Sequence, residues 1–563
     1  MKKISKWTRF SFIILMFLFV SFTSAAQADN LLKAASPNPA FVTWQKNAQP
    51  SANNGSPAAN YGYAPSPVNW RHLDNVTYGI NGRASFTKQS KAALPAVYDL
   101  RGKMPSVRNQ NPFGNCWTHS AMAATESNLI TKGLAKSADV YLSEWYLTYF
   151  AYKSTPAELS FTYTSPDYYN AGGDDWRAVA LLARGTGSVT DKEVKTPAAI
   201  GEIYTPSVIK RSYKLVNALY LGNGGLRENQ LNETKRRELI KEAIQTKGAV
   251  SVGIFWDDEA YDGTNMTFNS SNNYQTVGTN HAVTIVGWDD NFSAGKFSKH
   301  APKANGAWIV RNSWGTDFGD RGYFYVSYEE PTLCDGVVYE TETAPADERI
   351  YQYDYLGNVG FLKYDGTSLS ERRNAGSLNT AYFANIFTAK GNDRLDSVAL
   401  YTTVPDQQCE IKIYSGCVSS PTDGKLEATK NITVAAPGYN TITLDAPLKL
   451  TKGDKFSVVV KTTSEAEYMI PCEYVQAGYS DGAAGQTGTG WVSQDGVTYR
   501  DILTVANANS YKNAIICIKA FAAADPSEPS PSASSGGGCN AGIAPLALWG
   551  FLGLALLTFK KRA

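Results

Sequence analysis

The stretch VRNQNPFGNCWTHSAM, residues 107–122, decides the fold of this chain. Two turn-forming pairs, Asn111-Pro112 and Gly114-Asn115, come directly before Cys116, and residues 117–130 have the composition of a helix with small residues for close packing. A thiol at a helix N-terminus lies at the positive end of the helix dipole, which stabilises the thiolate. Because the thiolate is the nucleophilic form, the sequence marks Cys116 as a candidate catalytic residue.

A nucleophile of this kind needs a base, and the chain contains only four histidines. His281 lies in GTNHAVTIVGW, residues 278–288, where a polar turn opens into an apolar, β-branched strand pattern. His119 is the alternative, because it lies three positions after Cys116 and the two side chains would share one helix face. A third segment, GAWIVRNSWG at residues 306–315, holds Asn312, whose amide could orient an imidazole.

These segments resemble, in the same order, the nucleophile, histidine and asparagine segments of papain-like cysteine peptidases. LPAVYDLR, residues 94–101, is similar to the start of the mature domain in that family. The resemblance implies a Cys-His-Asn triad that hydrolyses peptide bonds through a thioester intermediate. It assigns Cys116 as nucleophile, His281 as base, Asn312 as the residue that orients His281, Trp314 as the cover over the His-Asn pair, and Gln110 as the oxyanion-hole amide.

The resemblance also implies a peptide-binding segment at Gly172 and Gly173, where missing side chains let an extended peptide approach. Asn280, next to the base, is placed with the substrate-binding residues. The family has an aromatic residue at position 119, so packing is the expected role of His119. The His281 and Asn312 spacings from Cys116 are long, which predicts insertions at residues 292–305 and in part of residues 204–245.

The cysteine pattern differs from that of the family. Phe113 replaces a cysteine of the usual motif, and Asn170-Ala171, directly before the Gly172-Gly173 pair, include no cysteine, so both halves of one disulfide are absent together. Of the seven cysteines, Cys409 with Cys417, or Cys472 with Cys517, could be bridged, and the sequence alone does not assign the connectivity.

The N-terminal residues predict export followed by a leader. Residues 1–28 combine four basic residues, an apolar run and a small-residue cleavage pattern, as a secretory signal peptide does. Residues 29–93 form the leader, in which residues 35–67 lack a helical period and predict an extended segment. Residues 62–68 (GYAPSPV) resemble the leaders of bacterial and archaeal peptidases that carry a lectin-like domain. We expect the leader to cover the cleft and to be removed near Leu94.

The C-terminal half has a different pattern. Short alternating runs between residues 350 and 522, separated by Pro, Gly and Asp turns, predict an antiparallel β-sandwich. It resembles the lectin-like domain of those peptidases, which implies carbohydrate binding, with bracing of the catalytic domain as the alternative. Residues 523–538 form a Pro/Ser/Gly linker. Residues 539–563, apolar and ending in Lys-Lys-Arg, resemble a bacterial C-terminal sorting signal of the Synerg-CTERM type, with a tail anchor as the alternative.

Together these observations predict an α+β fold. A papain-like peptidase domain with a helical lobe and a β-barrel-like lobe (94–345) precedes the sandwich domain (346–522). We expect an exported cysteine endopeptidase at a bacterial cell surface or outer envelope, associated with the membrane through its tail, that acts on proteins or peptides. A surface adhesin that retains the fold for binding and a transpeptidase are the alternatives.

The histidines lack metal-ligand spacing, so neither a metal nor another cofactor is expected. Without its two basic ends the chain is mildly acidic, which argues against nucleic-acid binding.

Overall fold

The structure is a computed structural model that describes residues 31–48, 61–74, 76, 78–82, 94–152, 168–192, 194, 211–222, 230–272, 277–365, 378–505 and 511–525. The predicted signal peptide, most of the linker and the predicted sorting tail lie outside these residues. Within the described part of the chain, no helix has both the length and the apolar character needed to cross a bilayer.

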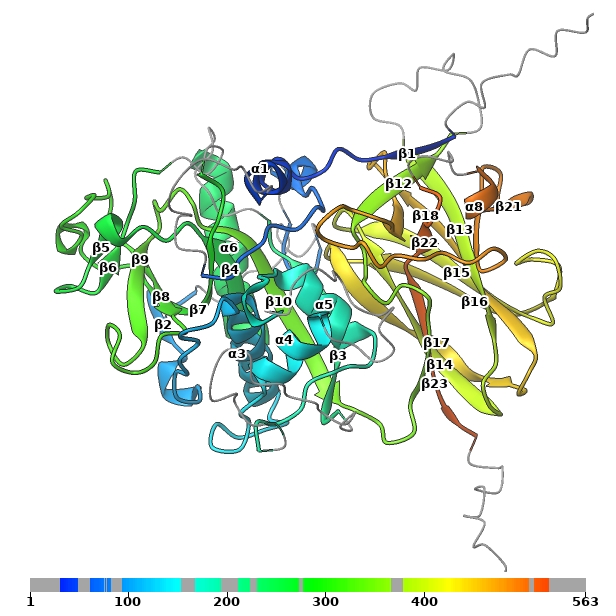
Figure 1. The fold of residues 1–563 in the computed structure, drawn as a ribbon, viewed down its shortest axis with the longest axis horizontal. Helices are drawn as coiled ribbons and strands as arrows, with labels where there is room; N and C mark the ends of the chain where they lie inside the picture. The colour runs from blue at the N-terminus through cyan, green and yellow to red at the C-terminus, as the bar shows by residue number, and fades with distance from the viewer. Residues whose placement is uncertain are drawn as a thin grey trace, which may run out of the picture. The chain divides into compact units, whose positions relative to one another are not determined.

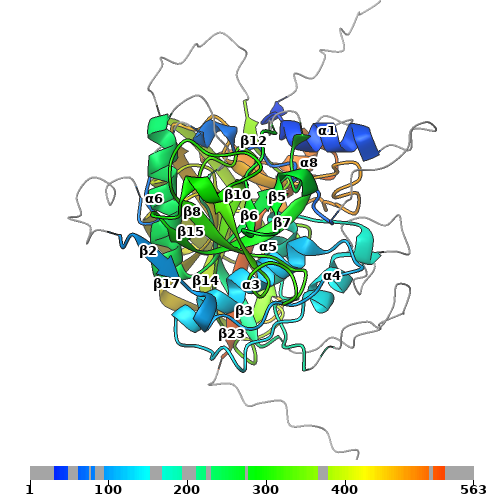
Figure 2. The same ribbon diagram turned by 90° about the vertical axis from the view of Figure 1, so that its left-hand side faces the viewer.

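The helical lobe of the peptidase domain is built around α3, Cys116–Thr131, which matches the predicted helix within one residue at each end. Its side chains are buried from Cys116 through Leu129, which is why small residues dominate the helix. Helices α4 (Glu144–Tyr152) and α5 (Asp175–Ala183) pack against α3 and against each other (Figure 2). The longer α6 (Gln230–Lys247) contacts β10, Cys334–Thr343.

The second lobe of the peptidase domain consists of strands. In β7 (His281–Asp289) the first eight side chains are buried, as the apolar sequence pattern predicts. On one side β7 pairs with β8 (Ala307–Arg311), which is followed by β9 (Tyr323–Ser327), and on the other with β4 (Val250–Ile254), which is followed by β10. The shorter elements of this domain are β2 (Val97–Asp99), β5 (Tyr261–Asp262), β6 (Thr267–Phe268) and the 3-10 turns Arg101–Lys103, Tyr168–Asn170, Asp258–Ala260 and Ala294–Lys296.

The predicted antiparallel sandwich is confirmed, and its strands contain the alternating sequence runs at residues 397–401, 410–414, 440–444 and 456–461. One layer has the order β16-β15-β18-β13-β20-β21, and the facing layer contains β11-β23-β14-β17. Apolar side chains from both layers form one buried core. The bounds are β11 Arg349–Tyr351, β12 Gly360–Tyr364, β13 Asn379–Thr388, β14 Asp393–Thr402, β15 Gln407–Ser415, β16 Lys425–Val434, β17 Gly438–Leu450, β18 Lys455–Ser464, β19 Ile470–Glu473, β20 Gly490–Ser493, β21 Tyr499–Asp501, α8 Ile502–Val505, β22 Ile515–Ile516 and β23 Ile518–Ala524.

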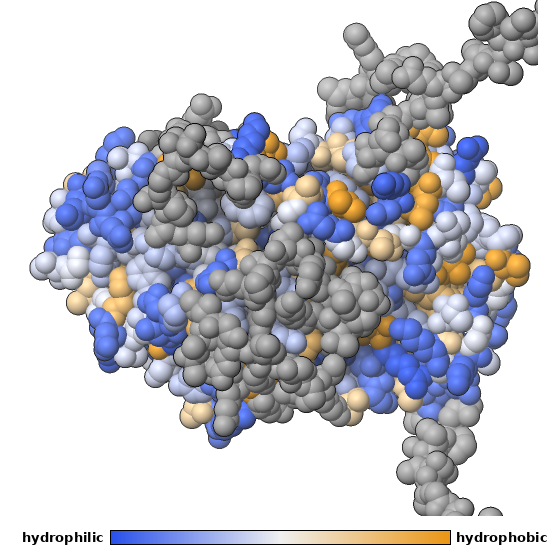
Figure 3. Space-filling view, in the orientation of Figure 1, coloured by the Kyte–Doolittle hydropathy of each residue, from blue (hydrophilic) through white to orange (hydrophobic). Residues whose placement is uncertain are grey.

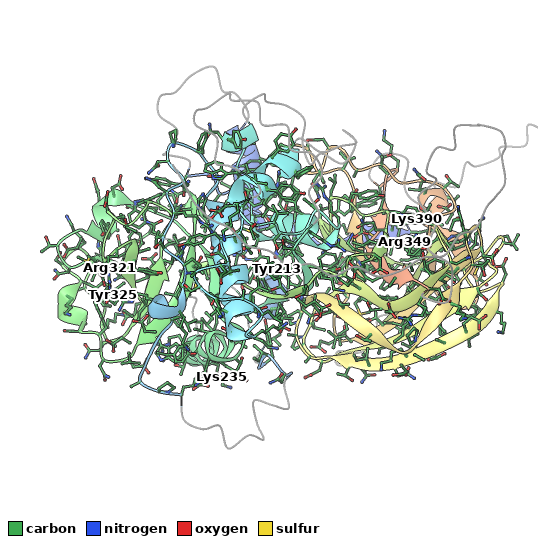
Figure 4. The ribbon with its side chains drawn as sticks, turned by 90° about the horizontal axis from the view of Figure 1, so that it is seen from below. Tyr213, Lys235, Arg321, Tyr325, Arg349 and Lys390 are labelled. Atoms are coloured by element: carbon green, nitrogen blue, oxygen red, sulfur yellow. The ribbon has the colours of Figure 1, made fainter. Side chains whose placement is uncertain are left out.

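Strand β3, Tyr213–Tyr220, connects the two domains within one sheet. It pairs with β10 of the peptidase domain on one side and with β17 of the sandwich domain on the other, both antiparallel. Figure 4, in which Tyr213 is labelled, shows the start of this strand between the peptidase strands and the sandwich strands. Residues predicted only as part of an insertion therefore join the two sheets.

The leader contains regular structure that its sequence did not predict. Residues 39–48, which were expected to be extended, form helix α1 (Pro39–Ala48), and β1 (Leu32–Ala34) pairs with β12 of the sandwich domain (Figure 1). The ring of Phe41 packs edge-on against Tyr479 of that domain, 5.6 Å between centroids. This ring contact and the strand pairing join residues that are remote in sequence, so no local sequence pattern predicts them. Further along, the leader forms a 3-10 turn at Arg71–Leu73.

The described cysteines form no disulfide. All of them are free and buried, so neither of the two pairs that the sequence left open is bridged: Cys116, Cys334, Cys409, Cys417, Cys472 and Cys517.

On the face in Figure 3, hydrophobic residues of the sandwich domain form separate spots instead of one continuous patch.

Candidate active site

The residues assigned to the triad come together at the junction of the two lobes. Cys116 begins α3, His281 begins β7, and Asn312 directly follows β8. His281 Nε2 lies 2.8 Å from Asn312 Oδ1, and the backbone N–H of Ala282 donates to Cys116 Sγ at 3.3 Å. The other ring nitrogen of His281, Nδ1, is buried and has no hydrogen-bond partner among the described residues.

Trp314 lies against the imidazole of the His-Asn pair. Its indole stacks on the imidazole of His281, with 5.0 Å between ring centroids and 22° between ring planes. Trp256 packs edge-on against the same indole at 4.7 Å, and this tryptophan was not identified from the sequence. The stacked rings exclude water from the imidazole–amide hydrogen bond, which holds the imidazole in one orientation.

Gln110 is held in place on three sides. Its Nε2 donates to the carbonyl of Phe113 at 2.8 Å, its Oε1 accepts from Ser313 Oγ at 2.6 Å, and its backbone N–H donates to the Ser313 carbonyl at 2.7 Å. The same Nε2 lies 2.9 Å from the carbonyl oxygen of Tyr61 in the leader. The backbone N–H of Cys116 approaches that oxygen to 3.4 Å. The two proposed oxyanion donors therefore converge on one leader carbonyl.

The leader also pairs with the predicted peptide-binding segment. Gly173 N–H donates to the Gly62 carbonyl at 3.0 Å, and Ala64 N–H donates to the Gly173 carbonyl at 2.8 Å, as in a parallel bridge. Gly62 has φ of 104°, and a Cβ at that position would lie 2.0 Å from the carbonyl oxygen of Gly114. Only glycine lets the leader pass this close to the turn before Cys116. Gly172 carries no leader hydrogen bond of this kind; its carbonyl accepts from Tyr152.

Asn280 has a different set of contacts. Its Oδ1 accepts from the backbone N–H of Trp256 at 2.7 Å, and its Nδ2 donates to the backbone carbonyl of Trp256 at 3.0 Å. This paired hydrogen bond fixes the loop that enters β7 and thereby the position of His281. A role of Asn280 in binding substrate remains a prediction.

His119 lies in a buried charged cluster and lines the same small cavity as Asn312. Its Nδ1 is 3.4 Å from Glu144 Oε1, and its ring packs edge-on against Trp145 at 5.9 Å. Arg108 donates to both Glu126 and Glu144 from one guanidinium nitrogen. Burial and the nearby Arg108 charge hold the pKa of His119 well below its usual value, so the ring is neutral. The expected packing role of His119 agrees with this environment.

Burial controls the ionisation of the candidate nucleophile and base. It raises the pKa of the Cys116 thiol to about 12, although the Ala282 N–H acts in the opposite direction. It lowers the pKa of His281 to about 4, although the hydrogen bond to Asn312 favours the charged ring. The sequence predicted a thiolate favoured by the helix dipole. With the leader over the site, desolvation outweighs that effect, because a charge in a dry environment is costly.

The described residues contain no group of three or more His, Cys, Asp or Glu side chains arranged to hold a metal ion. The site therefore consists of a thiol, an imidazole, two amides and backbone N–H donors. These groups can carry out nucleophilic attack, proton transfer and stabilisation of an oxyanion.

Two segments of the chain match known protein families. Residues 171–342 match the papain family cysteine protease and residues 350–522 match the lectin like domain. Cysteine proteinase 3 of Entamoeba histolytica is 26% identical over 47% of this chain and 72% of its own length. Peptidase 1 of Dermatophagoides farinae is 26% identical over 44% of this chain, and the match spans 65% of that protein.

Solved structures share the two-domain fold. The cysteine protease and lectin-like domains of Cwp84, a surface layer associated protein of Clostridium difficile, superpose with a TM-score of 0.69 at 22% identity, over 88% of this chain and 99% of that one. Cwp84 after propeptide cleavage gives a TM-score of 0.61 at 23% identity, over 76% of this chain and 99% of that one. The predicted papain-like fold is thus confirmed.

Proposed function

We propose that this chain, which carries a papain-family cysteine protease domain followed by a lectin-like domain, is an exported cysteine endopeptidase whose leader keeps it inactive. Its triad is Cys116, His281 and Asn312. The observation that carries this proposal is the Tyr61 carbonyl, held between Gln110 Nε2 and the Cys116 N–H. A substrate carbonyl at the same place would lie beside the Cys116 thiol.

The proposed reaction begins when the Cys116 thiol proton passes to His281 Nδ1 and the sulfur attacks the peptide carbonyl carbon. The carbonyl oxygen takes up the negative charge and is stabilised by Gln110 Nε2 and the Cys116 N–H. The C–N bond then breaks, and His281 returns the proton to the leaving amine, which leaves a thioester on Cys116. Water, deprotonated by His281, hydrolyses the thioester to a carboxylic acid and the free thiol. Asn312 Oδ1 holds the ring through Nε2 throughout.

The leader would inhibit this reaction in two ways. It fills the oxyanion position and pairs with Gly173, so no substrate can bind there. It also keeps the site dry, which favours a neutral thiol and a neutral imidazole. Removal of the leader admits water and a substrate, and the ion pair of thiolate and imidazolium becomes accessible. This is a second physical reason, beyond steric exclusion, for low activity in the uncleaved chain.

We place the protein at a bacterial cell surface. This part of the proposal rests on the predicted signal peptide and sorting tail and on the likeness to Cwp84, which is described as surface layer associated. The lectin-like domain suggests a carbohydrate ligand in the cell envelope. Membrane association through the tail stays a prediction.

A peptidase assay on the cleaved chain tests the catalytic proposal. The uncleaved and the leader-free chain are incubated with a fluorogenic peptide under reducing conditions, with Cys116→Ala as the control. We expect hydrolysis only by the leader-free chain and none by the Cys116→Ala variant. A thiol-reactive active-site reagent should label the leader-free chain irreversibly at one position, Cys116. Intact mass and N-terminal sequencing locate the leader cleavage site.

The two alternatives give different results in the same experiment. A surface adhesin would leave the peptide intact after leader removal and would leave Cys116 unlabelled. A transpeptidase would form a product with an added amine, and mass spectrometry distinguishes that product from the free acid.

A further inference from the structure

Tyr63 of the leader fills a pocket next to the peptide-binding segment. It is the residue between the two backbone hydrogen bonds to Gly173, and its side chain is 3% exposed. Its hydroxyl donates to Asp335 Oδ2 at 3.1 Å. Asp335 lies near the start of β10, next to the β-bulge where that strand leaves β4. The pocket therefore ends in a carboxylate.

The depth of this pocket depends on Gly253 in β4. A Cβ on Gly253 would lie 3.3 Å from the Tyr63 ring and 3.2 Å from both Thr279 and Cys334. Any side chain at position 253 would thus occupy the space that the Tyr63 ring fills. Glycine here leaves room for a long side chain to reach Asp335.

Three carboxyl groups lie near the pocket. Besides Asp335, the carboxyl groups of Asp174 and Asp175 lie close enough to act on the Tyr63 phenol. Burial and then these negative charges raise the pKa of Tyr63 well above its usual value. A hydrogen-bond donor or a cation at the end of a bound side chain is favoured here, whereas an apolar end leaves Asp335 without that partner.

We propose that Asp335 and Gly253 select peptides that carry a long side chain ending in a hydrogen-bond donor or cation, namely Lys, Arg or Tyr, at the residue that pairs with Gly173. The Tyr63 side chain of the leader occupies this pocket until the leader is removed. The inference rests on the proposed peptidase function and adds the class of side chain that the site accepts. The leader passes the oxyanion donors with Tyr61 and Gly173 with Tyr63, so a substrate whose pocket residue precedes the scissile bond runs in the opposite direction. The residue that such a substrate places beside Gly173 has the Tyr63 pocket within reach of its side chain.

The test uses two matched pairs of side chains in one fluorogenic peptide. Lys is compared with Met, and Tyr with Phe, at each of the three positions before the scissile bond in turn. For the leader-free chain we expect kcat/KM to be about 10- to 100-fold higher for Lys than for Met, and higher for Tyr than for Phe, at one of these positions. In Asp335→Asn the Lys preference should fall to within about 3-fold.

Asp335→Asn suits this test because residue 335 has φ of 53°, a conformation that asparagine also adopts readily. Asp347→Asn, an exposed aspartate outside the pocket, is the matched control and should keep the preference. Gly253→Val fills the pocket and should reduce hydrolysis of the Lys and Tyr peptides while a peptide with Ala at that position is still cleaved.

The outcomes separate this inference from the proposed function. Hydrolysis with equal rates for Lys and Met at all three positions, or a Lys preference that survives in Asp335→Asn, overturns the inference and leaves the peptidase function standing. An absence of hydrolysis of every peptide, with no labelling of Cys116, instead counts against the peptidase function itself.

Discussion

Tyr479 of the sandwich domain donates a hydrogen bond from its hydroxyl to Asp174 Oδ2, 2.8 Å away in the peptidase domain. Asp174 caps α5 by accepting from backbone N–H groups, and the guanidinium of Arg177 lies 4.0 Å from the Tyr479 ring centroid. Arg177 also donates to the hydroxyl of Tyr152, which donates to the Gly172 carbonyl, each at 2.5 Å. A buried chain of contacts thus leads from the sandwich domain to the proposed peptide-binding segment.

Substitution of Tyr479 by Phe should weaken peptide binding more than it slows the chemical step. The variant keeps the ring under Arg177 but leaves Asp174 without one buried hydrogen bond, which costs about 1–3 kcal/mol. We expect a several-fold rise in KM with kcat nearly unchanged, measured on the leader-free chain with a fluorogenic peptide. Tyr353→Phe removes a tyrosine hydrogen bond of 2.7 Å elsewhere in the same domain and should leave KM unchanged.

Substitution of Gln110 by Ala should lower kcat by roughly 10²- to 10³-fold, because one of two oxyanion donors is lost. KM should change much less, since the donor acts on the charge that develops in the transition state. Steady-state kinetics measures both values, and a thermal unfolding curve checks that the variant is folded. The neighbouring Asn111→Ala, at an exposed position, is the control. A kcat within threefold of wild type would contradict the assignment of Gln110.

The two candidate bases should respond in opposite ways. His281→Ala should abolish peptide hydrolysis, because His281 is the imidazole that is hydrogen-bonded to Asn312. His119→Phe should keep activity within about threefold, since His119 is a neutral, buried ring that contacts Glu144 and Trp145. Initial rates on the same peptide measure both variants. Loss of activity in His119→Phe, with a normal unfolding temperature, would reverse the assignment.

The stability of the chain should fall as pH rises, in part because of Glu473. Burial and the nearby Asp354 raise the pKa of the Glu473 carboxyl to about 8 in the folded chain. A raised pKa means that the folded state binds the proton more tightly. This contribution is therefore complete below pH about 4.5 and is lost as pH rises through about 8, at up to about 1.4 kcal/mol per pH unit.

Glu473→Gln isolates the pH-dependent contribution of Glu473 to the free energy of unfolding, because the amide resembles the protonated carboxyl and does not titrate. The free energy of unfolding, measured with urea from pH 5 to pH 8, should match wild type at the acidic end, and the variant should be increasingly more stable toward pH 8. Glu467→Gln, whose side chain is 57% exposed, should follow the wild-type profile. A difference between wild type and Glu473→Gln that does not vary with pH would show that Glu473 ionises normally.

Local sequence patterns predicted the elements that carry the residues of the proposed triad. The helix at Cys116 and the strand at His281 have strong signals, because turn residues, small residues and β-branched runs act over a few positions. Helix α1 in the leader was missed because its formation depends on packing against the sandwich domain through Phe41 and Tyr479. The sequence predicted strand β3 only as part of an insertion, because the strands it pairs with, β10 and β17, are more than 100 residues away.

The sequence by itself determined the identity and order of the groups in the proposed triad, because a thiol after a tight turn, an imidazole at a strand start and an orienting amide each require particular residues at particular spacings. Only the tertiary structure decided what surrounds them. The Tyr61 carbonyl at the oxyanion donors, Tyr63 against Asp335, and Tyr479 against Asp174 all join residues remote in sequence. Such contacts depend on packing and desolvation in three dimensions, and these are set by the whole fold and not by any local stretch of the chain.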